Sequence, residues 1–135
     1  MEISDDNHCF VCGELNLSGL RVRPRIDAPN QSATMRLVIP RAFQGWQGVV
    51  HGGILATLLD ETCAYAAKGL VLHVVTAAIT VTYKKPVPIE TEVLVSATVV
   101  SRRHKIIEVK GQIAIDGELY AEASARMFIV AGGRQ

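Results

Sequence analysis

The chain has 135 residues, of which 49% are hydrophobic and 20% are charged, as in globular proteins and unlike disordered ones. Its 14 Lys and Arg residues and 13 Asp and Glu residues leave a net charge of +1, which argues against binding of nucleic acid through bulk charge. The length predicts a single domain over residues 1–135.

Local features favour a reduced, cytoplasmic protein. The first eight residues are acidic and polar, unlike a signal or transit peptide. The longest apolar run, residues 69–81, is shorter than the roughly 20 residues that a membrane span needs. Three cysteines are an odd number for a disulfide framework. We therefore expect neither export nor a membrane as partner.

The first half of the chain predicts a strand and one long helix. Residues 1–20 are rich in Asn, Gly and Cys and are expected to be irregular. Residues 21–39 alternate weakly, with a turn-like break at 28–31 and a predicted strand at 33–39. Residues 52–68 are the best helix candidate, because core-forming side chains recur there at helical spacing. These recurring residues are Ile54, Leu55, Leu58, Leu59 and Thr62.

Four strands are predicted after the helix, at residues 74–83, 92–101, 105–115 and 119–130. The last two alternate between apolar and polar side chains, and Asp116-Gly117 between them is a strong hairpin signal. The economical packing is a curved antiparallel sheet wrapped around the helix, which is an α+β architecture.

An acidic residue, Asp60, lies in the middle of the apolar helix. A carboxylate there costs free energy unless it is paired, hydrogen-bonded or open to a cleft. The helix begins after His51 with Gly52 and Gly53, and such poor helix formers indicate that another molecule approaches the backbone closely. The first N–H groups of a helix have no internal partner, so this end can polarise a carbonyl and stabilise an oxyanion.

The spacing of these residues predicts a site shared by two chains. Asp60 lies nine residues after His51, which is roughly 13 Å along a helix, so the two cannot meet within one chain. Two antiparallel helices across a two-fold axis would place each Asp60 opposite the Gly52 of the other chain. We therefore expect a symmetric dimer with two equal composite sites.

Several stretches match one known family in register. His51-Gly52-Gly53 is followed by Asp60, and Cys9-Phe10-Val11-Cys12-Gly13 is followed by Gly19-Leu20. The other matching stretches are Val75-Thr76 through Tyr83 with Pro86 and Pro88, and Asp116 through Ala121. Together they cover most of the chain and resemble the hotdog-fold acyl-CoA thioesterases of the phenylacetate-pathway (PaaI-like) branch.

This resemblance implies a hotdog fold, in which a curved antiparallel sheet of about five or six strands surrounds one long central helix. It implies a homodimer, often paired into a homotetramer, with sites at the dimer interface. The implied reaction hydrolyses an acyl-CoA thioester to a free acid and coenzyme A, without a metal or redox cofactor.

The resemblance also implies residue roles. The Gly52 N–H would bind the thioester carbonyl, and Asp60 of the partner chain would act as general base or nucleophile. Thr76 would hold the water or the acid. His51 would position the loop and contact the carbonyl, while Gly53 would lie against the substrate.

Position 45 departs from the family. Many relatives carry Asn or Gln six residues before the His, where this chain has Gly45. Gln44, beside it, is the substitute that we expect to contact the substrate. This difference keeps open a non-catalytic acyl-CoA binding or sensing protein. A dehydratase or hydratase of the same fold pairs a His with an acid around a different loop, and that pattern is not seen.

Four smaller features also need an interpretation. Arg102 and Arg103 belong to a basic cluster that is either a solvated turn or a contact for coenzyme A phosphates. Cys9 and Cys12 have the spacing of half a zinc site, but no second pair follows, so a packed turn and no metal site are expected. Adjacent helix positions point about 100° apart, so Glu61, next to Asp60, is expected to be solvated or at an interface. Cys63 is most simply a small buried hydrophobe.

Overall fold

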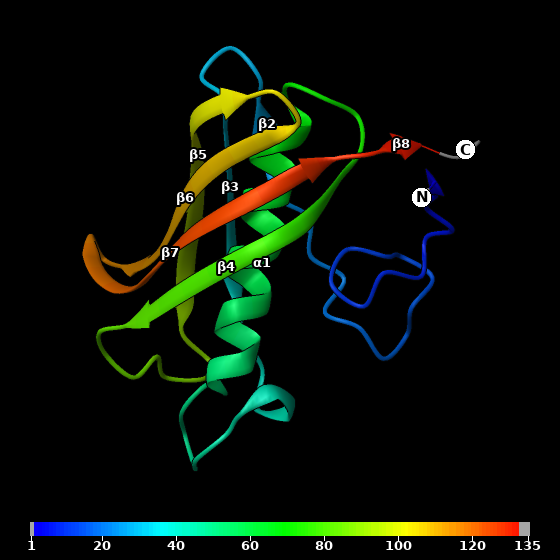
Figure 1. Cartoon of the computed structure of the whole chain (residues 1–135). Helices are drawn as coiled ribbons and strands as arrows, with labels where there is room; N and C mark the ends of the chain where they lie inside the picture. The colour runs from blue at the N-terminus through cyan, green and yellow to red at the C-terminus, as the bar shows by residue number, and fades with distance from the viewer. Residues whose placement is uncertain (1, 133–135) are drawn as a thin grey trace.

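A computed structural model describes residues 2–132 (Figure 1). Six strands form one antiparallel sheet in the order β2-β3-β5-β6-β7-β4, and helix α1 lies against one face of it. A two-stranded parallel sheet joins the two ends of the described chain. The bounds are β1 Glu2–Ile3, β2 Arg25–Asp27, β3 Ser32–Val38, the 3-10 helix Arg41–Phe43, α1 Gly52–Lys68, β4 Val74–Tyr83, β5 Glu92–Arg103, β6 Ile106–Ile115, β7 Glu118–Ile129 and β8 Ala131–Gly132.

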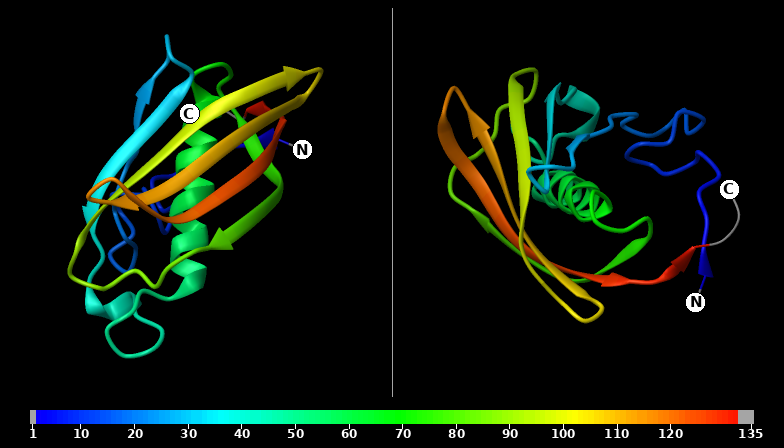
Figure 2. Two further views of the ribbon diagram at one scale, coloured as in Figure 1. Left: turned by 90° about the vertical axis from the view of Figure 1, so that its left-hand side faces the viewer. Right: turned by 90° about the horizontal axis from the view of Figure 1, so that it is seen from above.

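The sheet curves around α1, and the view from above in Figure 2 shows the helix inside that curve. Strand alternation explains the packing, because every second side chain of β6 and β7 is buried against the helix side. Ile107, Val109 and Met127 are among these buried residues. The expected hotdog architecture, a curved antiparallel sheet around one long helix, is confirmed.

Two parts of the fold differ from the sequence expectation. Residues 2–20 are irregular except for β1, which pairs with β8 and could not be foreseen because both strands are two residues long. The sequence predicts a sheet wrapped around the helix, but one stripe of α1 stays partly exposed in the single chain. It consists of Gly53, Ala56, Thr57, Asp60 and Ala64.

Strand β4 forms a free edge of the large sheet beside this stripe, and it contains a β-bulge. Thr76 pairs with Met127 and Ala78 pairs with Arg126, so Ala77 is the extra residue. The extra residue reverses which side chains of β4 point toward the helix. Both Thr76, before the bulge, and Ile79, after it, therefore lie on the helix side of the sheet. Thr76, Ala77 and Ala78 are all exposed in the single chain.

Among the described residues, no helix combines the length and the apolar character that crossing a membrane requires.

Candidate functional site

The N-terminus of α1 is capped by the side chain of His51. Its Nδ1 accepts a hydrogen bond from the Gly53 N–H at 2.9 Å, and its backbone carbonyl accepts from Ile54 and Leu55. Because Nδ1 is the acceptor, the neutral ring carries its proton on Nε2. The cap therefore occupies the Gly53 N–H and fixes the imidazole beside the first turn.

Gly52 is the first residue of the helix, and within residues 2–132 its N–H has no hydrogen-bond partner. Its carbonyl accepts a hydrogen bond from the Tyr83 hydroxyl at 2.8 Å, which ties the helix start to the end of β4. An adjoining hollow of about 430 Å³ has Trp46, Val50, His51 and Gly52 in its wall. The free donor thus faces open space at the positive end of the helix dipole.

Asp60 lies near the middle of α1 and is half-buried. The Thr76 hydroxyl donates a hydrogen bond to Asp60 Oδ1 at 2.5 Å, and Thr76 Oγ1 also lies 3.4 Å from Met127 Sδ. The β4 bulge directs Thr76 toward the helix, so two residues predicted from sequence to share a site are in direct contact. The second oxygen of Asp60 makes no hydrogen bond with the described residues.

One chain does not bring Asp60 to the helix N-terminus. Gly52 and Asp60 are eight residues apart in a continuous helix, which corresponds to roughly 12 Å along its axis. The Gly52 N–H and the Asp60 carboxylate therefore lie apart from each other, on the same partly exposed side of the molecule.

The loop before the helix explains the unusual Gly45. A Cβ atom at position 45 would lie 3.3 Å from both Cα and Cδ2 of His51, a tight contact that a larger side chain could make only if the loop or His51 shifted by a few tenths of an ångström. Gln44 accepts a hydrogen bond from the Gly48 N–H through Oε1 at 3.0 Å. The side-chain carbonyl of Gln44 thus links the two ends of the loop 44–48. The side-chain NH₂ group of Gln44 remains as a donor.

Arg102 and Arg103 lie near the β5–β6 turn, beside a hollow of about 550 Å³ that Arg126 also lines. The neighbouring end of β6 pairs with the end of β7, and β7 pairs there with the start of β4 at Val74. This basic group is therefore at the C-terminal end of α1, opposite Gly52 within one chain.

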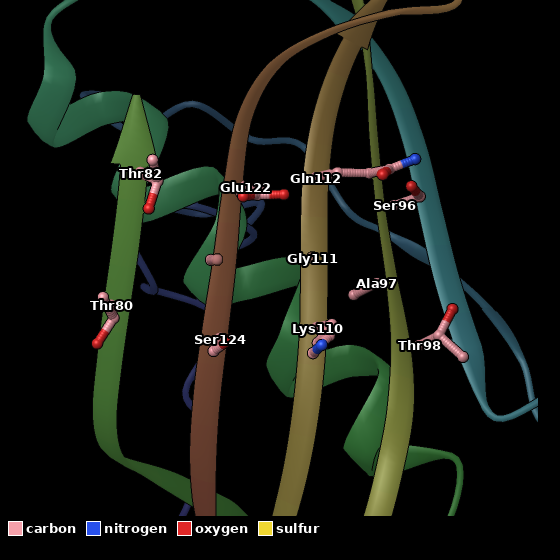
Figure 3. Close-up of a pocket in the computed structure, with 11 residues that line it drawn as sticks. Thr80, Thr82, Ser96, Ala97, Thr98, Lys110, Gly111, Gln112, Glu122 and Ser124 are labelled. Carbon is pink, nitrogen blue, oxygen red and sulfur yellow. The ribbon is translucent and has the colours of Figure 1, made fainter. Parts of the chain in front are cut away.

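A separate hollow of about 380 Å³ lies on the sheet face that α1 does not cover (Figure 3). Hydroxyl side chains of β4, β5 and β7, such as Thr80, Ser96 and Ser124, line much of it. Its acidic residue, Glu122, forms an ion pair with Lys84 at 3.4 Å. The sheet separates this hollow from Asp60 and Gly52, so it is not part of the candidate site.

The remaining titratable groups of α1 point elsewhere. Burial raises the pKa of the Cys63 thiol to about 12, and the charge of Asp60 adds to the shift, so this thiol is protonated at neutral pH. Burial also raises the pKa of Glu61 above its usual range. Glu61 faces Cys9 and Cys12, on a different side of the helix from Thr76.

Sequence reasoning missed Tyr83 and Arg126 as neighbours of the site residues. Tyr83 faces the helix only because the β4 bulge shifts the alternation, and a bulge leaves no reliable sequence signal. Arg126 joins the basic group through strand pairing with β6, where it lies opposite Glu108.

The sequence profile of the thioesterase superfamily matches residues 47–121, which is more than half of the chain. The acyl-coenzyme A thioesterase THEM4 of Mus musculus is 35% identical over 87 residues, covering 62% of this chain and 36% of that protein. The chain thus spans about a third of the length of this curated relative.

Solved structures share the fold. A thioesterase superfamily protein superposes with a TM-score of 0.82 at 24% identity, covering 92% of this chain and 61% of the other. A phenylacetic acid degradation-related protein from Ralstonia eutropha JMP134 superposes with a TM-score of 0.71 at 24% identity, covering 78% and 83%. Because the profile match spans the helix start, the helix, three strands and the beginning of β7, the chain belongs to the thioesterase superfamily as a hotdog-fold member.

Proposed function

We propose that the protein hydrolyses an acyl-CoA thioester to a free acid and coenzyme A, at sites shared by two chains. Membership of the thioesterase superfamily supports the reaction class, and the name of the mouse relative supports the acyl-CoA substrate. The match covers only part of that relative, and the geometry of this chain supplies the further support.

The observation that carries the proposal is the unpartnered Gly52 N–H, which opens on a hollow at the helix N-terminus. A thioester carbonyl oxygen bound there would accept this hydrogen bond, which strengthens as negative charge develops on the oxygen. His51 accepts the Gly53 N–H through Nδ1 and so holds the first turn, and its Nε2–H would remain for the contact with the carbonyl. Gly53 and the free amide of Gln44 would border the bound substrate.

Asp60 supplies the second half of the reaction. As general base, its carboxylate would take a proton from water while the water oxygen attacks the thioester carbon. The C–S bond then breaks, and the coenzyme A thiolate leaves and takes up a proton. As nucleophile, the same carboxylate would bond to the acyl carbon while the C–S bond breaks and the thiolate leaves, and water would then hydrolyse the resulting anhydride to the free acid and the carboxylate. In both routes, the Thr76 hydroxyl holds Asp60 through the hydrogen bond to Oδ1.

A two-fold axis would join the two halves of the site. Strand β4 is a free sheet edge with small exposed residues, and the partly exposed stripe of α1 lies beside it. Pairing two chains along these elements with antiparallel helices would cover both features. It would also bring Asp60 of the partner subunit to Gly52. The partner's Asp60 would thus take the place of the chain's own Asp60, which lies roughly 12 Å from Gly52 along the helix.

The same antiparallel arrangement would move the basic group to the substrate. Arg102 and Arg103 lie at the C-terminal end of α1, and the C-terminal end of one helix is next to the N-terminal end of its antiparallel partner. The arginines of the partner subunit would then face the side on which coenzyme A leaves the hollow. Guanidinium groups bind phosphates well, so we propose these residues as phosphate contacts.

Gly45 favours one second candidate, an acyl-CoA binding protein that does not turn its ligand over. The amide that many relatives carry at this position is absent, and the tight approach to His51 opposes its return. Release of free coenzyme A from a panel of acyl-CoAs distinguishes the two candidates. The panel should span phenylacetyl, benzoyl, short, medium and long acyl groups.

We expect turnover by the wild type and a loss of about 10²- to 10⁴-fold in kcat for Asp60→Asn. Asp116→Asn is a matched control, because Asp116 is in an exposed hairpin turn with φ 49°, where Asn is well tolerated. Saturable binding without coenzyme A release by the wild type would reject hydrolysis in favour of the binding protein. Equal activity of both variants would remove Asp60 from the chemistry.

A further inference from the structure

Two cysteines and a glutamate meet on the side of α1 that faces the N-terminal segment. Cys9, Cys12 and Glu61 each offer one metal-ligating atom, and these atoms all lie within 4.8 Å of one another. Glu61 comes from the helix, 49 positions beyond Cys12, so the spacing of the cysteines in the sequence shows only two of the three ligands. We propose that this cluster binds a divalent zinc-class ion, with Cys9, Cys12 and Glu61 as its protein ligands.

The turn that carries the two cysteines is tightly built. The Val11 N–H donates to Cys9 Sγ at 3.4 Å, and the Gly13 N–H donates to the Cys9 carbonyl at 2.8 Å. A Cβ atom at Gly13 would lie 2.5 Å from the backbone nitrogen of Cys9, so glycine is required for this close approach. These contacts hold the Cys9 and Cys12 side chains close together, on the side of the turn that faces Glu61.

Glu61 lacks the cation that a half-buried carboxylate usually has. Its side chain contacts Cys9 Sγ at 3.9 Å, and across residues 2–132 no lysine or arginine nitrogen lies within ion-pair distance of it. Lys68 and Arg23 contribute positive charge only from farther away. A divalent ion between the carboxylate and the two sulfurs would displace the two thiol protons and place a positive charge in direct contact with Glu61.

The donor set selects the kind of ion. Two thiolates with one carboxylate suit Zn²⁺ better than Mg²⁺ or Ca²⁺, which prefer oxygen ligands. The fourth position of a tetrahedral site would open on an adjoining cavity of about 520 Å³, with His8 and His73 in its wall. Water or one of these imidazoles would complete the coordination.

This site is independent of the proposed thioester chemistry, since Asp60 and Thr76 face a different side of α1. Its test is therefore a binding measurement on the metal-free, reduced full chain, with Co²⁺ as the spectroscopic probe and Zn²⁺ as competitor. Reducing conditions are needed because a Cys9–Cys12 disulfide would remove both thiolate ligands. We expect one Co²⁺ per chain, with a thiolate-to-cobalt charge-transfer band that added Zn²⁺ abolishes.

Variants assign the band to its ligands. Cys12→Ala should abolish it, whereas Cys63→Ala, the matched control at a buried cysteine outside the cluster, should keep it. Glu61→Gln should keep the fold and lower the Co²⁺ affinity more than about tenfold. If Cys12→Ala does not fold by circular dichroism, Cys9→Ser replaces it, because Cys9 is less buried. Absence of a stoichiometric band in the wild type, or its survival without a Cys9 or Cys12 thiol, would overturn the proposal.

Discussion

Asp60 and Glu61 are consecutive acidic residues on one helix, yet they stand in different chemical surroundings. Asp60 accepts a hydrogen bond from Thr76 on the free edge strand, on the side where we propose a second chain to pack. Glu61 faces two cysteines of the N-terminal segment. The rotation of about 100° between adjacent helix positions separates the two environments.

The comparison teaches that the residue type alone does not assign a role. Asp60 has a hydroxyl partner and an oxygen free to act, and it stands on a side that the single chain leaves open. Glu61 has no hydroxyl partner and no cation within ion-pair distance in the described part of the chain. The neighbouring strand or turn is therefore the basis on which we propose Asp60 for the chemistry and Glu61 for metal binding.

Substituting these two acidic residues should impair two different activities: one substitution should lower turnover, and the other should weaken metal binding. Asp60→Asn should lower kcat by about 10²- to 10⁴-fold while Co²⁺ binding is unchanged. Glu61→Gln should weaken Co²⁺ binding, with a far smaller loss of turnover than Asp60→Asn. Kinetics and cobalt absorption on the same protein samples measure both effects. Parallel losses in both assays for either variant would contradict the separation of roles.

Gly52→Pro removes the proposed oxyanion donor itself. Proline is favoured at the first helical position, and His51 has φ −59° and ψ 134°, an extended conformation that suits a residue before proline. We expect kcat to fall about 10²- to 10³-fold without loss of unfolding free energy. Gly52→Ala keeps the N–H, and its Cβ would meet Tyr83 at an ordinary 3.5 Å. If Gly52→Pro were as active as Gly52→Ala, this N–H would have no role.

Thr76→Val should have a smaller effect, because it removes the hydrogen bond to Asp60 while nearly keeping the side-chain volume. We expect kcat to fall about tenfold, as for loss of one hydrogen bond to a charged group. Thr76→Ser should restore most of the activity, since the hydroxyl returns. A serine variant as impaired as the valine variant would show that the methyl group, rather than the hydroxyl, matters.

The smallest effect is expected at the basic group. Reversing the charge of Arg102 and Arg103 should raise KM several-fold and leave kcat nearly unchanged, because the residues would bind the coenzyme and not the reacting atoms. Higher salt should reduce the difference from the wild type. An unchanged KM at low salt would show that these arginines do not contact coenzyme A and belong only to a solvated turn.

Much of the fold could be predicted from the sequence. Helical spacing indicated residues 52–68, and the long strands could be located from alternation and the Asp116-Gly117 turn. The β4 bulge and the short β1–β8 pairing could not, because both depend on contacts that are remote in sequence.

The candidate site was only partly predictable. The contact between Asp60 and Thr76 followed from family resemblance. The cap that His51 forms on Gly53 and the hydrogen bond from Tyr83 to Gly52 could not be predicted, because they depend on the local conformation of the helix start and of β4. Glu61 illustrates the limit, since nothing local shows that the N-terminal cysteines pack against it.

Mixing two inactive variants tests whether each site is shared between two chains. Asp60→Asn chains and Gly52→Pro chains are unfolded together, refolded and assayed. A mixed dimer has one intact site, formed by Gly52 of one chain and Asp60 of the other. Statistical assembly from equal amounts predicts recovery of about a quarter of the wild-type activity. Activity that stays at the level of the separate variants, with mixed dimers shown to be present, would contradict a site shared between chains.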